Sequence, residues 1–487
     1  VTLYFHAQPG QPPACGAGAL DLTTGTTRTY TGQATGRPDL WTADDVVQFI
    51  SVFPPKEIWI GWYQPNTNSS ATPEAMPSES HFRRLLGQPT TPLHLMSMDH
   101  HGAFSSELAR SEYLQRCYGI KSLLPPFTYL GLRSPHEEMA LLQLLHFVEE
   151  HHPSMLHSFH RNEPWIPHQR LICGNHALTQ LQLAGPCLKE TVMGLFDKCI
   201  TSMGKRAIQE RLMSPYSDAA TIRMRLEEVT DYRTWSPTKA SALERQLRFM
   251  FDLPRLHRKI LCGTILPVEI AGLFQTYTAM NAVRTLTSDT HLKAPLSEET
   301  WDAYHAICHA QWDQEKAQTS SADVAPLNGE TYPMISTTEQ QIQDTWAAIH
   351  AMRKEIATAA NLSEDAIRIE EREKEPFGFK GSTITLQQLK KNQNKLPEGI
   401  TFSQLKSGGW IDGPLIQRWN TTLQKQRDTL ANLYRIHAVE ACLAISEAGR
   451  DHWTAMEQWI CHVDGTQCIG RVSHERGFSW PGVEDMT

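Results

Sequence analysis

The sequence predicts an α+β protein of several structural units, mostly helical, with a small α/β unit at its N-terminal end. The 487 residues are too many for a single compact core. Short strand-like runs are concentrated in residues 1–125, whereas helical periodicity dominates from Pro135 onward. Near residues 366–412, a segment of alternating, strand-like character interrupts two long helical patterns.

The N-terminal region alternates short apolar runs with turn residues. Runs that predict strands, separated by Pro, Gly and Thr, are Val1–Phe5, Gly18–Leu22, Thr27–Tyr30, Glu57–Trp62 and Leu93–Met98. Helices are predicted between them at 42–50, 80–86 and 105–118, with Thr42 as the N-cap of the first. Because Val1 already lies in a strand-like run, we expect the chain to begin inside a folded domain. Strands followed by alternating helices and strands predict a small α/β domain.

Residues from 135 to about 318 are predicted to be helical. Glu137–Glu150 carries leucines at 141, 142, 144 and 145, and 197–229 predicts a long helical segment that is broken at Pro215. The stretch 319–333 is rich in Ser, Ala, Pro and Gly, which predicts a loop or linker.

Two long helices are predicted on either side of the strand-rich insert. Ser336–Glu339 predicts a capping box for the first helix, which should end near Ala366. The second should run from about 415 to 448, roughly 50 Å at 1.5 Å per residue. The apolar seams of the two helices are Ile342, Trp346, Ile349 and Ile356, then Ile416, Trp419, Leu423, Leu430 and Leu433. Between them, Phe377–Leu386 and 399–406 alternate like strands, so the segment predicts an arm whose tip reaches around a partner.

The charge balance reverses at this predicted tip. The whole chain has a formal net charge of −8, but residues 376–411 hold five lysines and one acid. Those lysines are Lys380, Lys390, Lys391, Lys395 and Lys406. Lysine is a flexible point charge that suits phosphate contacts rather than the reading of bases. A solvated loop would explain the charge alone, but the inserted position favours contact with a nucleic-acid backbone.

No enzymatic signature was found in the sequence. It lacks GxxxxGK[ST], GxSxG, HExxH and EF-hand patterns, so no catalytic residue is predicted and the chain is not expected to be an enzyme. Asp99–His101 and His151-His152 are weak metal candidates, because adjacent histidines do not share a helix face and carboxylates are few nearby; no metal site is expected. The ten cysteines form no CxxC and predict reduced thiols inside a cell. No stretch is long and apolar enough to predict a membrane span.

One segment resembles a known family. Thr201-Ser-Met-Gly-Lys-Arg-Ala-Ile-Gln-Glu-Arg-Leu-Met-Ser-Pro215, followed by Ile222-Arg-Met-Arg-Leu-Glu-Glu-Val229, resembles the core pattern of MutS mismatch-repair proteins. The pattern is T-P-M-G-x-R-x-L-(x)3-L-x-x-P, then I-x-x-R-L-x-x-V. The family's proline after the threonine is Ser202 here, and its usual Pro-Leu is Pro215-Tyr216.

Further segments resemble the same family in the same order along the chain. Gly18–Gly25 resembles a strand of the connector domain, and Leu141–Glu150 resembles the helix before the core. Leu171–Leu183 resembles the family's L-x-L-D-x-x-T-x-x-x-L-E-L segment, although Gly174 replaces its aspartate and Gln182 its glutamate. The remaining matches are Asp252–Ile260 in the core, Phe377-Gly-Phe at the opening of the clamp, Gln404–Lys406 in a clamp strand, and Glu475–Pro481 at the end of the lever.

The resemblance implies a division of the chain into MutS-type parts. Residues 1–127 would be a connector with an RNase-H-like α/β fold and no implied nuclease activity. Residues 128–335 would be the helical core, 336–365 and 413–448 the lever helices, 366–412 a β-rich clamp, and 449–487 a return segment of the core. Thr201, Gly204, Arg206 and Pro215 would be structural: Gly204 for close helix packing and Arg206 for pairing with a carboxylate.

The resemblance also implies partners. The clamp would embrace duplex DNA through nonspecific phosphate contacts of the five lysines, within a homo- or heterodimer of MutS-type chains, and the connector could meet a MutL-type protein. The mismatch-binding and ATPase domains of the family are absent from this chain. No cofactor is therefore expected on it, and ATP and Mg²⁺ are expected only with a C-terminal ATPase domain. The location would be a compartment with a genome, nucleus or mitochondrion.

A different function stays open at this point. An ATPase-less relative could be a scaffold in a larger assembly such as a ribonucleoprotein, with protein or RNA partners. The two hypotheses differ in whether the tip lysines bind free duplex DNA.

Overall fold

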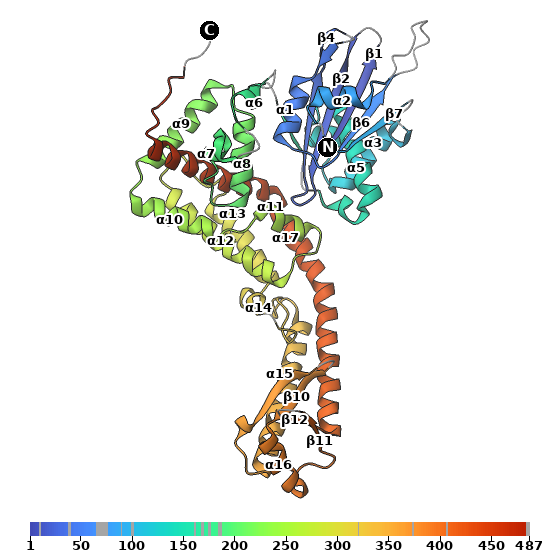
Figure 1. The fold of residues 1–487 in the computed structure, drawn as a ribbon, viewed down its shortest axis with the longest axis vertical. Coiled ribbons are helices and arrows are strands. Elements are labelled where there is room, and N and C mark those ends of the chain that lie inside the picture. Colours follow the sequence, from blue (N-terminus) through green and yellow to red (C-terminus); the bar gives the residue numbers. More distant parts are fainter. Residues whose placement is uncertain are drawn as a thin grey trace. The chain divides into compact units, whose positions relative to one another are not determined.

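The computed structural model describes residues 1–8, 11–37, 40–64, 76–88, 90–98, 102–159, 162–166, 170–173, 177–183, 188–319, 321–372, 375–405 and 408–483. They belong to two compact units (Figure 1). Unit 1 comprises Val1–Ile265, Gly272–Trp301 and Gly449–Thr487, and unit 2 comprises Leu266–Ala271 and Asp302–Ala448. Helices outnumber strands, so the prediction of a mostly helical α+β protein is confirmed.

Unit 1 contains a six-stranded sheet in the order β7-β6-β1-β2-β3-β8. β2 is antiparallel to both β1 and β3, whereas β6 is parallel to β1 and β7 is parallel to β6. The short β8 is parallel to β3. The strands are β1 (Thr2–Gln8), β2 (Gln11–Asp21), β3 (Thr26–Gln33), β6 (Ile58–Tyr63), β7 (Leu93–Met98) and β8 (Asn162–Pro164), with a separate ribbon of β4 (Thr35–Arg37) and β5 (Leu40–Thr42). All five predicted strands are confirmed, and β2 begins at Gln11 rather than Gly18.

Helices cover both faces of this sheet because side chains alternate along its strands. Leu3 and Phe5 of β1 pack in one core with α1 and α2, whereas Tyr4 packs in a second core with α3 and α5. These helices are α1 (Asp44–Val52), α2 (Glu79–Leu86), α3 (Glu107–Tyr118) and α5 (Pro135–His151). The second core also contains the apolar face predicted for Glu137–Glu150.

The prediction that Thr42 caps α1 is wrong. Thr42 belongs to β5, where it pairs with Thr35, and the N-cap residue is Ala43, which makes no side-chain capping bond. Asp44 and Asp45 do lie in the first turn, where acids stabilise the positive end of the helix dipole. Tertiary pairing of the ribbon therefore overrides the local capping preference of threonine.

The remainder of unit 1 is helical. As predicted, the helical segment 197–229 is interrupted near Pro215: α8 ends at Met213 and α9 begins at Ala219. The elements are η1 (Gly102–Phe104), α4 (Pro126–Tyr129), η2 (Pro153–Ser158), α6 (Ala177–Gln180), η4 (Leu188–Glu190), α7 (Val192–Leu195), α8 (Ser202–Met213), α9 (Ala219–Arg233), α10 (Pro237–Arg248) and α11 (Leu253–Leu261), with parts of α12 (Pro267–Thr287), α13 (Glu298–Gln311) and α17 (Pro414–Arg476).

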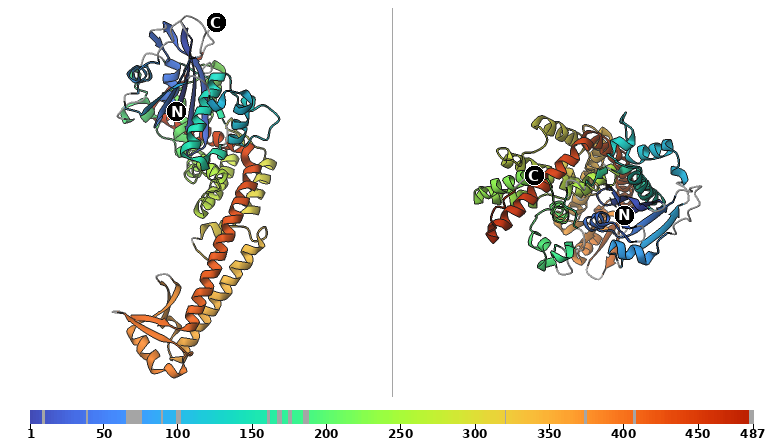
Figure 2. Two further views of the ribbon diagram at one scale, coloured as in Figure 1. Left: turned by 90° about the vertical axis from the view of Figure 1, so that its right-hand side faces the viewer. Right: turned by 90° about the horizontal axis from the view of Figure 1, so that it is seen from above.

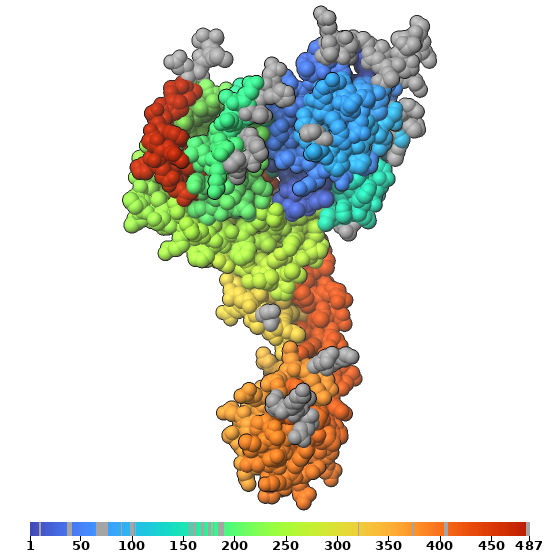
Figure 3. Space-filling model, viewed as in Figure 1, coloured from blue at the N-terminus to red at the C-terminus, as the bar shows by residue number. Residues whose placement is uncertain are grey.

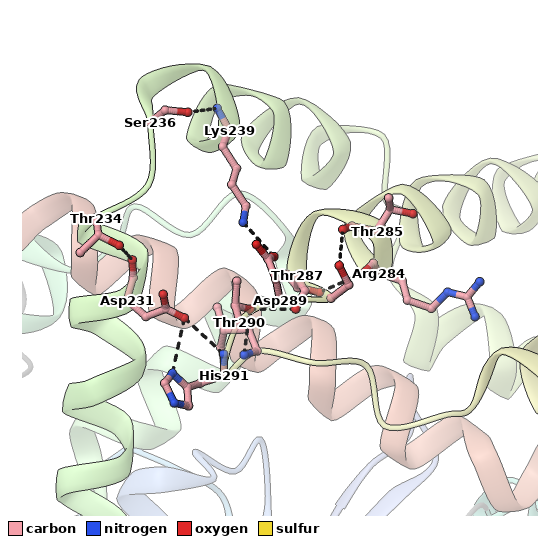
Figure 4. A network of polar contacts seen from close by, with 12 residues as sticks. Asp231, Thr234, Ser236, Lys239, Arg284, Thr285, Thr287, Asp289, Thr290 and His291 are labelled. Atoms are coloured by element: carbon pink, nitrogen blue, oxygen red, sulfur yellow. Dashed lines mark hydrogen bonds and ion pairs between the residues drawn. The ribbon is translucent and has the colours of Figure 1, made fainter.

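Polar contacts hold the turn that follows α12 against α9 and α10 (Figure 4). Lys239 Nζ donates to Asp289 Oδ1 at 3.2 Å, and the backbone N–H of His291 donates to Asp231 Oδ2 at 3.2 Å. These contacts are exposed, so each adds little to the free energy of unfolding. They fix the direction in which the chain leaves α12.

Unit 2 is built from two long helices and a four-stranded antiparallel sheet in the order β11-β12-β10-β9. Its elements are α14 (Gln314–Gln318), α15 (Pro333–Ala359), η5 (Glu364–Ala366), β9 (Ile367–Arg372), β10 (Glu375–Gly381), α16 (Thr383–Lys391), η6 (Gln393–Lys395), β11 (Thr401–Leu405), β12 (Gly408–Asp412) and the first part of α17. α16 packs against β10 and β12 (Figure 2).

The paired helices α15 and α17 carry the predicted apolar seams. Ile342, Ile349 and Ile356 are completely buried on α15, and Ile416, Leu423 and Leu430 are buried on α17. A spacing of seven residues keeps each stripe on one side of its helix. Thr345 Oγ1 of α15 donates to Gln426 Oε1 of α17 at 2.9 Å, which joins the two helices beside the seam.

Several predicted boundaries in unit 2 are wrong. Ser336–Glu339 is not a capping box, because α15 already begins at Pro333, a residue whose fixed φ favours the first helical turn. The same helix ends at Ala359 rather than near Ala366, just before Asn361 adopts a left-handed backbone (φ +54°). α17 does not stop near residue 448 but continues to Arg476.

The prediction that one strand runs from Phe377 to Leu386 is wrong in its second half. β10 ends at Gly381, and α16 begins at Thr383. Ser382 caps this helix, since its Oγ accepts the backbone N–H of Thr385 at 3.2 Å. One serine N-cap therefore outweighs the strand preference of Thr383 and Ile384.

Two negative findings apply only to the described ranges. Within them, no helix combines the length and apolar character that crossing a membrane would require. No three or more His, Cys, Asp or Glu side chains gather there as metal ligands would. The candidate Asp99–His101 lies outside the described residues.

Candidate nucleic-acid interface

Three of the five predicted lysines lie together on the surface of unit 2. Lys390 and Lys391 occupy the last turn of α16, and Lys395 ends η6 a few residues later. All three are exposed, and no hydrogen bond or ion pair joins their ammonium groups to any residue that the structure describes. We call these three residues the lysine tip; its segment is orange in Figure 3.

The lysine tip is fixed by buried leucines beneath it. Leu386 and Leu389 of α16 are 3% and 0% exposed, and Leu396 immediately after η6 is 8% exposed. Cations at the C-terminal end of a helix are stabilised by the helix dipole. Residues 382–397 contain no aspartate or glutamate, and the first acid after them is Glu398, which has no ion pair with the tip in the described part of the chain.

Lys380 is placed differently, because a glutamate outside the window 376–411 pairs with it. Lys380 Nζ lies 2.7 Å from Glu370 Oε2, and each side chain is 37% exposed. Glu370 lies on the adjacent strand β9, outside the window 376–411, so the cross-strand pair could not be seen by counting charges along the chain. Lys406 lies outside the described residues.

The sheet face around Lys380 carries residues that were not predicted. Trp410 of β12 is the cross-strand partner of Lys380. Lys380 Nζ and Arg372 Cζ each lie 5.5 Å from the centroid of the Trp410 ring. Arg372 Nη1 also contacts Asp412 Oδ1 at 2.5 Å. The alternation in Ile-Arg-Ile-Glu from residue 367 is the sequence signal that could have indicated this charged face.

Pairing makes this face close to neutral. Residues 366–412 hold eight basic and six acidic side chains, a net charge of +2, whereas the narrower window 376–411 has +4. The acids that reduce the charge are mostly on or beside β9. Within residues 366–412, the acids therefore lie mainly on or beside the sheet, whereas residues 382–397, which include the lysine tip, contain none.

In unit 1, the segment that begins at Thr201 binds a buried carboxylate. Asp464 of α17 is completely buried, and its Oδ2 accepts the Thr201 backbone N–H at 2.8 Å and the Thr201 hydroxyl at 2.7 Å. Its Oδ1 accepts the Ile200 N–H at 3.0 Å and the Gln467 Nε2–H at 3.0 Å. Thr201 is in turn the N-cap of α8, so the carboxylate lies at the positive end of this helix.

Gly204 and Arg206 have the structural roles expected for them. A Cβ on Gly204 would lie 2.2 Å from Asp464 Oδ2, so only glycine allows this close approach. Arg206 donates from Nη1 and Nη2 to the two oxygens of Asp252 at 2.7 and 2.8 Å, a bidentate pair. Burial raises the pKa of Asp252, but the Arg206 hydrogen bonds outweigh this and hold the pKa below its usual range. These contacts position helices and hold no reacting atom.

The Asp252–Ile260 segment contributes a buried histidine. His257 stacks on Trp453 with ring centroids 4.3 Å apart, its Nδ1 lies 2.5 Å from Glu457 Oε1, and its Nε2 lies 2.9 Å from Tyr277 Oη. Burial lowers the pKa of His257 to about 3, so the ring is neutral. A neutral ring satisfies both contacts when Nδ1–H donates to Glu457 and Nε2 accepts from Tyr277.

This lowered pKa predicts a pH dependence of stability. Below pH 6.5 the unfolded chain binds a proton at His257 that the folded chain does not, so stability is lost as the pH falls. We expect His257→Phe to remove a slope of roughly 1 kcal/mol per pH unit between pH 6.5 and 5. Urea unfolding at several pH values measures it. The exposed His474→Gln should leave the slope as it is; equal slopes for His257→Phe and wild type would contradict the assignment.

Comparison with known proteins connects this geometry to a family. Residues 176–378 match the family model described as MutS domain III. The chain is 26% identical over 196 residues to a DNA mismatch repair protein mutS homolog of Acanthamoeba polyphaga mimivirus, covering 37% of this chain and 17% of that protein. It is 27% identical over 184 residues to the DNA mismatch repair protein MutS of Dehalococcoides mccartyi, covering 37% and 21%.

A third relative is the mitochondrial DNA mismatch repair protein mutS homolog of Sarcophyton glaucum, which is 26% identical over 164 residues, 32% of this chain and 17% of that protein. The chain thus spans about a fifth or less of the length of these relatives. The matched model includes α8, α9 and α15, and therefore both the Thr201 segment and one of the long helices.

Proposed function

Because this chain belongs to the MutS family, whose domain III matches residues 176–378, we propose that unit 2 holds duplex DNA through its lysine tip in a mismatch-repair-related protein. The observation that carries the proposal is the lysine tip itself: Lys390, Lys391 and Lys395 are exposed, lack acidic partners among the described residues and stand in a 16-residue stretch without an acid.

The proposed contact is electrostatic and independent of sequence. Lysines that neutralise phosphates release condensed counterions, and this release supplies most of the affinity of nonspecific binding. The tip contains no arginine that could form a bidentate contact with a guanine edge. Lys380 is already engaged by Glu370 and contributes less in this proposal than its sequence position suggests.

The test is charge reversal at the tip. We expect the variant Lys390→Glu, Lys391→Glu, Lys395→Glu to lose at least tenfold in affinity for a 30-base-pair duplex at low salt. The slope of log K against log salt should fall by about 2 to 3, since each phosphate contact contributes about 0.9. Fluorescence anisotropy with a labelled duplex over a series of salt concentrations measures both quantities.

A matched control separates the site from overall charge. Lys189→Glu, Lys293→Glu and Lys425→Glu change the net charge equally at three exposed lysines outside residues 382–397. This control should keep most of the affinity. Equal losses in the two triple variants would mean that net charge, not the lysine tip, determines binding, and the proposal would then fail.

The finer parts of the proposal follow the family. Residues 1–127 would be the connector, with a sheet order and strand directions that support an RNase-H-like fold, and 336–365 and 413–448 the levers of the clamp. Two such chains would act as a homo- or heterodimer around the duplex. This segment would carry no catalysis of its own; ATP and Mg²⁺ would act in an ATPase domain of a longer parent protein, in a compartment that holds a genome.

One observation supports a scaffold as the second candidate. The sheet face beside the tip is nearly neutral, because Lys380 and Arg372 are paired with Glu370 and Asp412. A ribonucleoprotein scaffold would bind protein or RNA partners through such a face and leave free duplex unbound. Absence of any tip-dependent duplex binding at low salt would favour this candidate.

A further inference from the structure

A stripe of exposed apolar side chains runs along α17 in unit 2. Ile436, Val439 and Leu443 are 58%, 47% and 58% exposed. Steps of three and four residues place them on one side of the helix. Single exposed apolar side chains are ordinary on protein surfaces, whereas an apolar row along one helix face is a candidate contact surface. We call these three residues the α17 stripe.

The α17 stripe points away from the buried seam of the same helix. Leu430 belongs to that seam and is 2% exposed. Val439 follows Leu430 by nine residues, which is two and a half helical turns, so the two side chains leave α17 on opposite sides. His437, whose ring centroid lies 4.9 Å from that of Tyr332, continues the seam. Packing within unit 2 therefore explains the seam side of α17 but not the apolar side chains of the stripe.

One basic and one acidic side chain flank the α17 stripe. In the heptad notation of coiled coils, Ile436 and Leu443 occupy a positions and Val439 a d position, which places Arg435 at g and Glu440 at e. Arg435 is exposed, and no hydrogen bond or ion pair joins it to any residue that the structure describes. Glu440 is also exposed, and its described polar contact is made by Oε2, 2.8 Å from Nδ1 of a histidine on the same helix. Both charged groups are therefore accessible to a partner.

These charges fit a second copy of the same helix that runs in the same direction. In a parallel pair, the residue at g of one helix faces the residue at e of the next heptad on the other helix, five positions later. Arg435 of one copy would thus meet Glu440 of the second copy, and the two-fold symmetry of the pair would repeat this contact. In an antiparallel pair, g faces g and e faces e, which brings like charges together. Charge complementarity therefore favours the parallel arrangement.

We propose that the α17 stripe is a contact surface for a second copy of this chain, with the two α17 helices parallel. The inference rests on the proposed function only for the expectation that two chains pair; the surface itself uses no residue of the lysine tip. A standard interface buries about 800 Å² per partner, and three side chains cover less than this. Thr429 and Asn432 continue the same face with polar side chains, so the apolar contact is short. We therefore expect a weak pair, with a Kd on the order of 10–100 µM.

The decisive experiment exchanges the two flanking charges. We expect Arg435→Glu and Glu440→Arg each to weaken self-association at least about tenfold, because like charges then face each other across the pair. An equimolar mixture of the two variants should associate at least as tightly as the wild type, because both contacts again join opposite charges. Sedimentation velocity from about 5 to 500 µM chain, a range that brackets the expected Kd, measures all four samples. Recovery in the mixture also shows that both variants are folded.

Two further variants test the apolar part of the contact. Leu443→Glu places a charge in the α17 stripe and should abolish self-association. Leu415→Glu is the matched control, because Leu415 is 44% exposed on the same helix but lies outside the stripe, and it should associate as the wild type does. The proposal is overturned if the wild type stays monomeric up to about 500 µM, or if Leu443→Glu associates as tightly as Leu415→Glu. It is also overturned if the mixture associates no more tightly than either charge variant alone.

The triple lysine-tip variant separates this inference from the proposed function. Its three substitutions lie outside α17, so it should self-associate as the wild type does while it loses affinity for the duplex. If duplex binding proves independent of the tip while the charge exchange still controls association, the proposed function fails and the α17 contact stands. If duplex binding depends on the tip but the charge exchange has no effect on association, only the α17 contact is overturned.

Discussion

Replacement of Asp464 by alanine is expected to lower the free energy of unfolding of unit 1 by about 3–5 kcal/mol. The Asp464 carboxylate is completely buried and accepts the backbone N–H groups of Ile200 and Thr201, the Thr201 hydroxyl and the Gln467 amide. Alanine would leave these donors without an acceptor in an environment that water does not reach. Each buried donor without a partner costs about 1–3 kcal/mol, which makes this one of the most sensitive positions in the chain.

Two further variants give this prediction its controls. Asp464→Asn keeps one carbonyl oxygen and should lose about half as much, because the second oxygen and the charge are removed. Asp451→Ala, at an exposed position of the same helix α17, should change stability by no more than about 0.5 kcal/mol. Urea unfolding followed by circular dichroism measures all three. A loss below about 1 kcal/mol for Asp464→Ala would show that the donors find other acceptors.

The Asp464 contacts also show where sequence patterns stop being informative. The segment 201–215 indicated that Thr201, Gly204 and Arg206 are structural, and the structure confirms this. Nothing in the sequence near Asp464 connects it to Thr201, which lies 263 residues earlier. Local periodicity determines which face of α17 is buried, but the partner of a single buried carboxylate depends on the tertiary fold.

The strands and seams were predictable because burial follows their periodicity. The alternation of β1 places Leu3 and Phe5 on one face and Tyr4 on the other, and the seven-residue spacing from Ile342 to Ile356 marks the buried side of α15. Local end signals were less informative. Thr42 and Ser336 are both good caps by residue type, yet Thr42 pairs in a ribbon and Ser336 follows a proline that starts the helix earlier.

The lysine tip was only partly predictable for a related reason. Counting charge along the chain found Lys390, Lys391 and Lys395, because residues 382–397 contain no acid and no described contact pairs these lysines with one. The same count treated Lys380 as unpaired too, although Glu370 on the adjacent strand β9 forms an ion pair with it. A lysine that has no acid near it in the sequence can still be paired with an acid on the neighbouring strand. It is a candidate for binding a partner only if no such cross-strand pair exists.

The second large effect is expected at Gly16, where β2 meets the first turn of α5. A Cβ at this position would lie 1.9 Å from the His136 carbonyl oxygen and 2.2 Å from its carbon. Both are backbone atoms of α5, so relief requires the helix to move away from the sheet rather than a side chain to rotate. We expect Gly16→Ala to destabilise unit 1 by about 3 kcal/mol or more, at the upper end of overpacking effects.

A glycine-to-alanine substitution at an open position should raise stability rather than lower it. Comparing the two positions therefore tests whether packing causes the loss expected for Gly16→Ala. Gly465 lies inside α17, and a Cβ there would meet no atom within 4 Å. Gly465→Ala should therefore stabilise the protein by up to about 1 kcal/mol, because alanine favours a helix over the unfolded chain. Thermal and urea unfolding of both variants would measure the contrast. If Gly16→Ala were as stable as Gly465→Ala, α5 would not pack on β2 at this distance, and the second core would be looser than its buried side chains indicate.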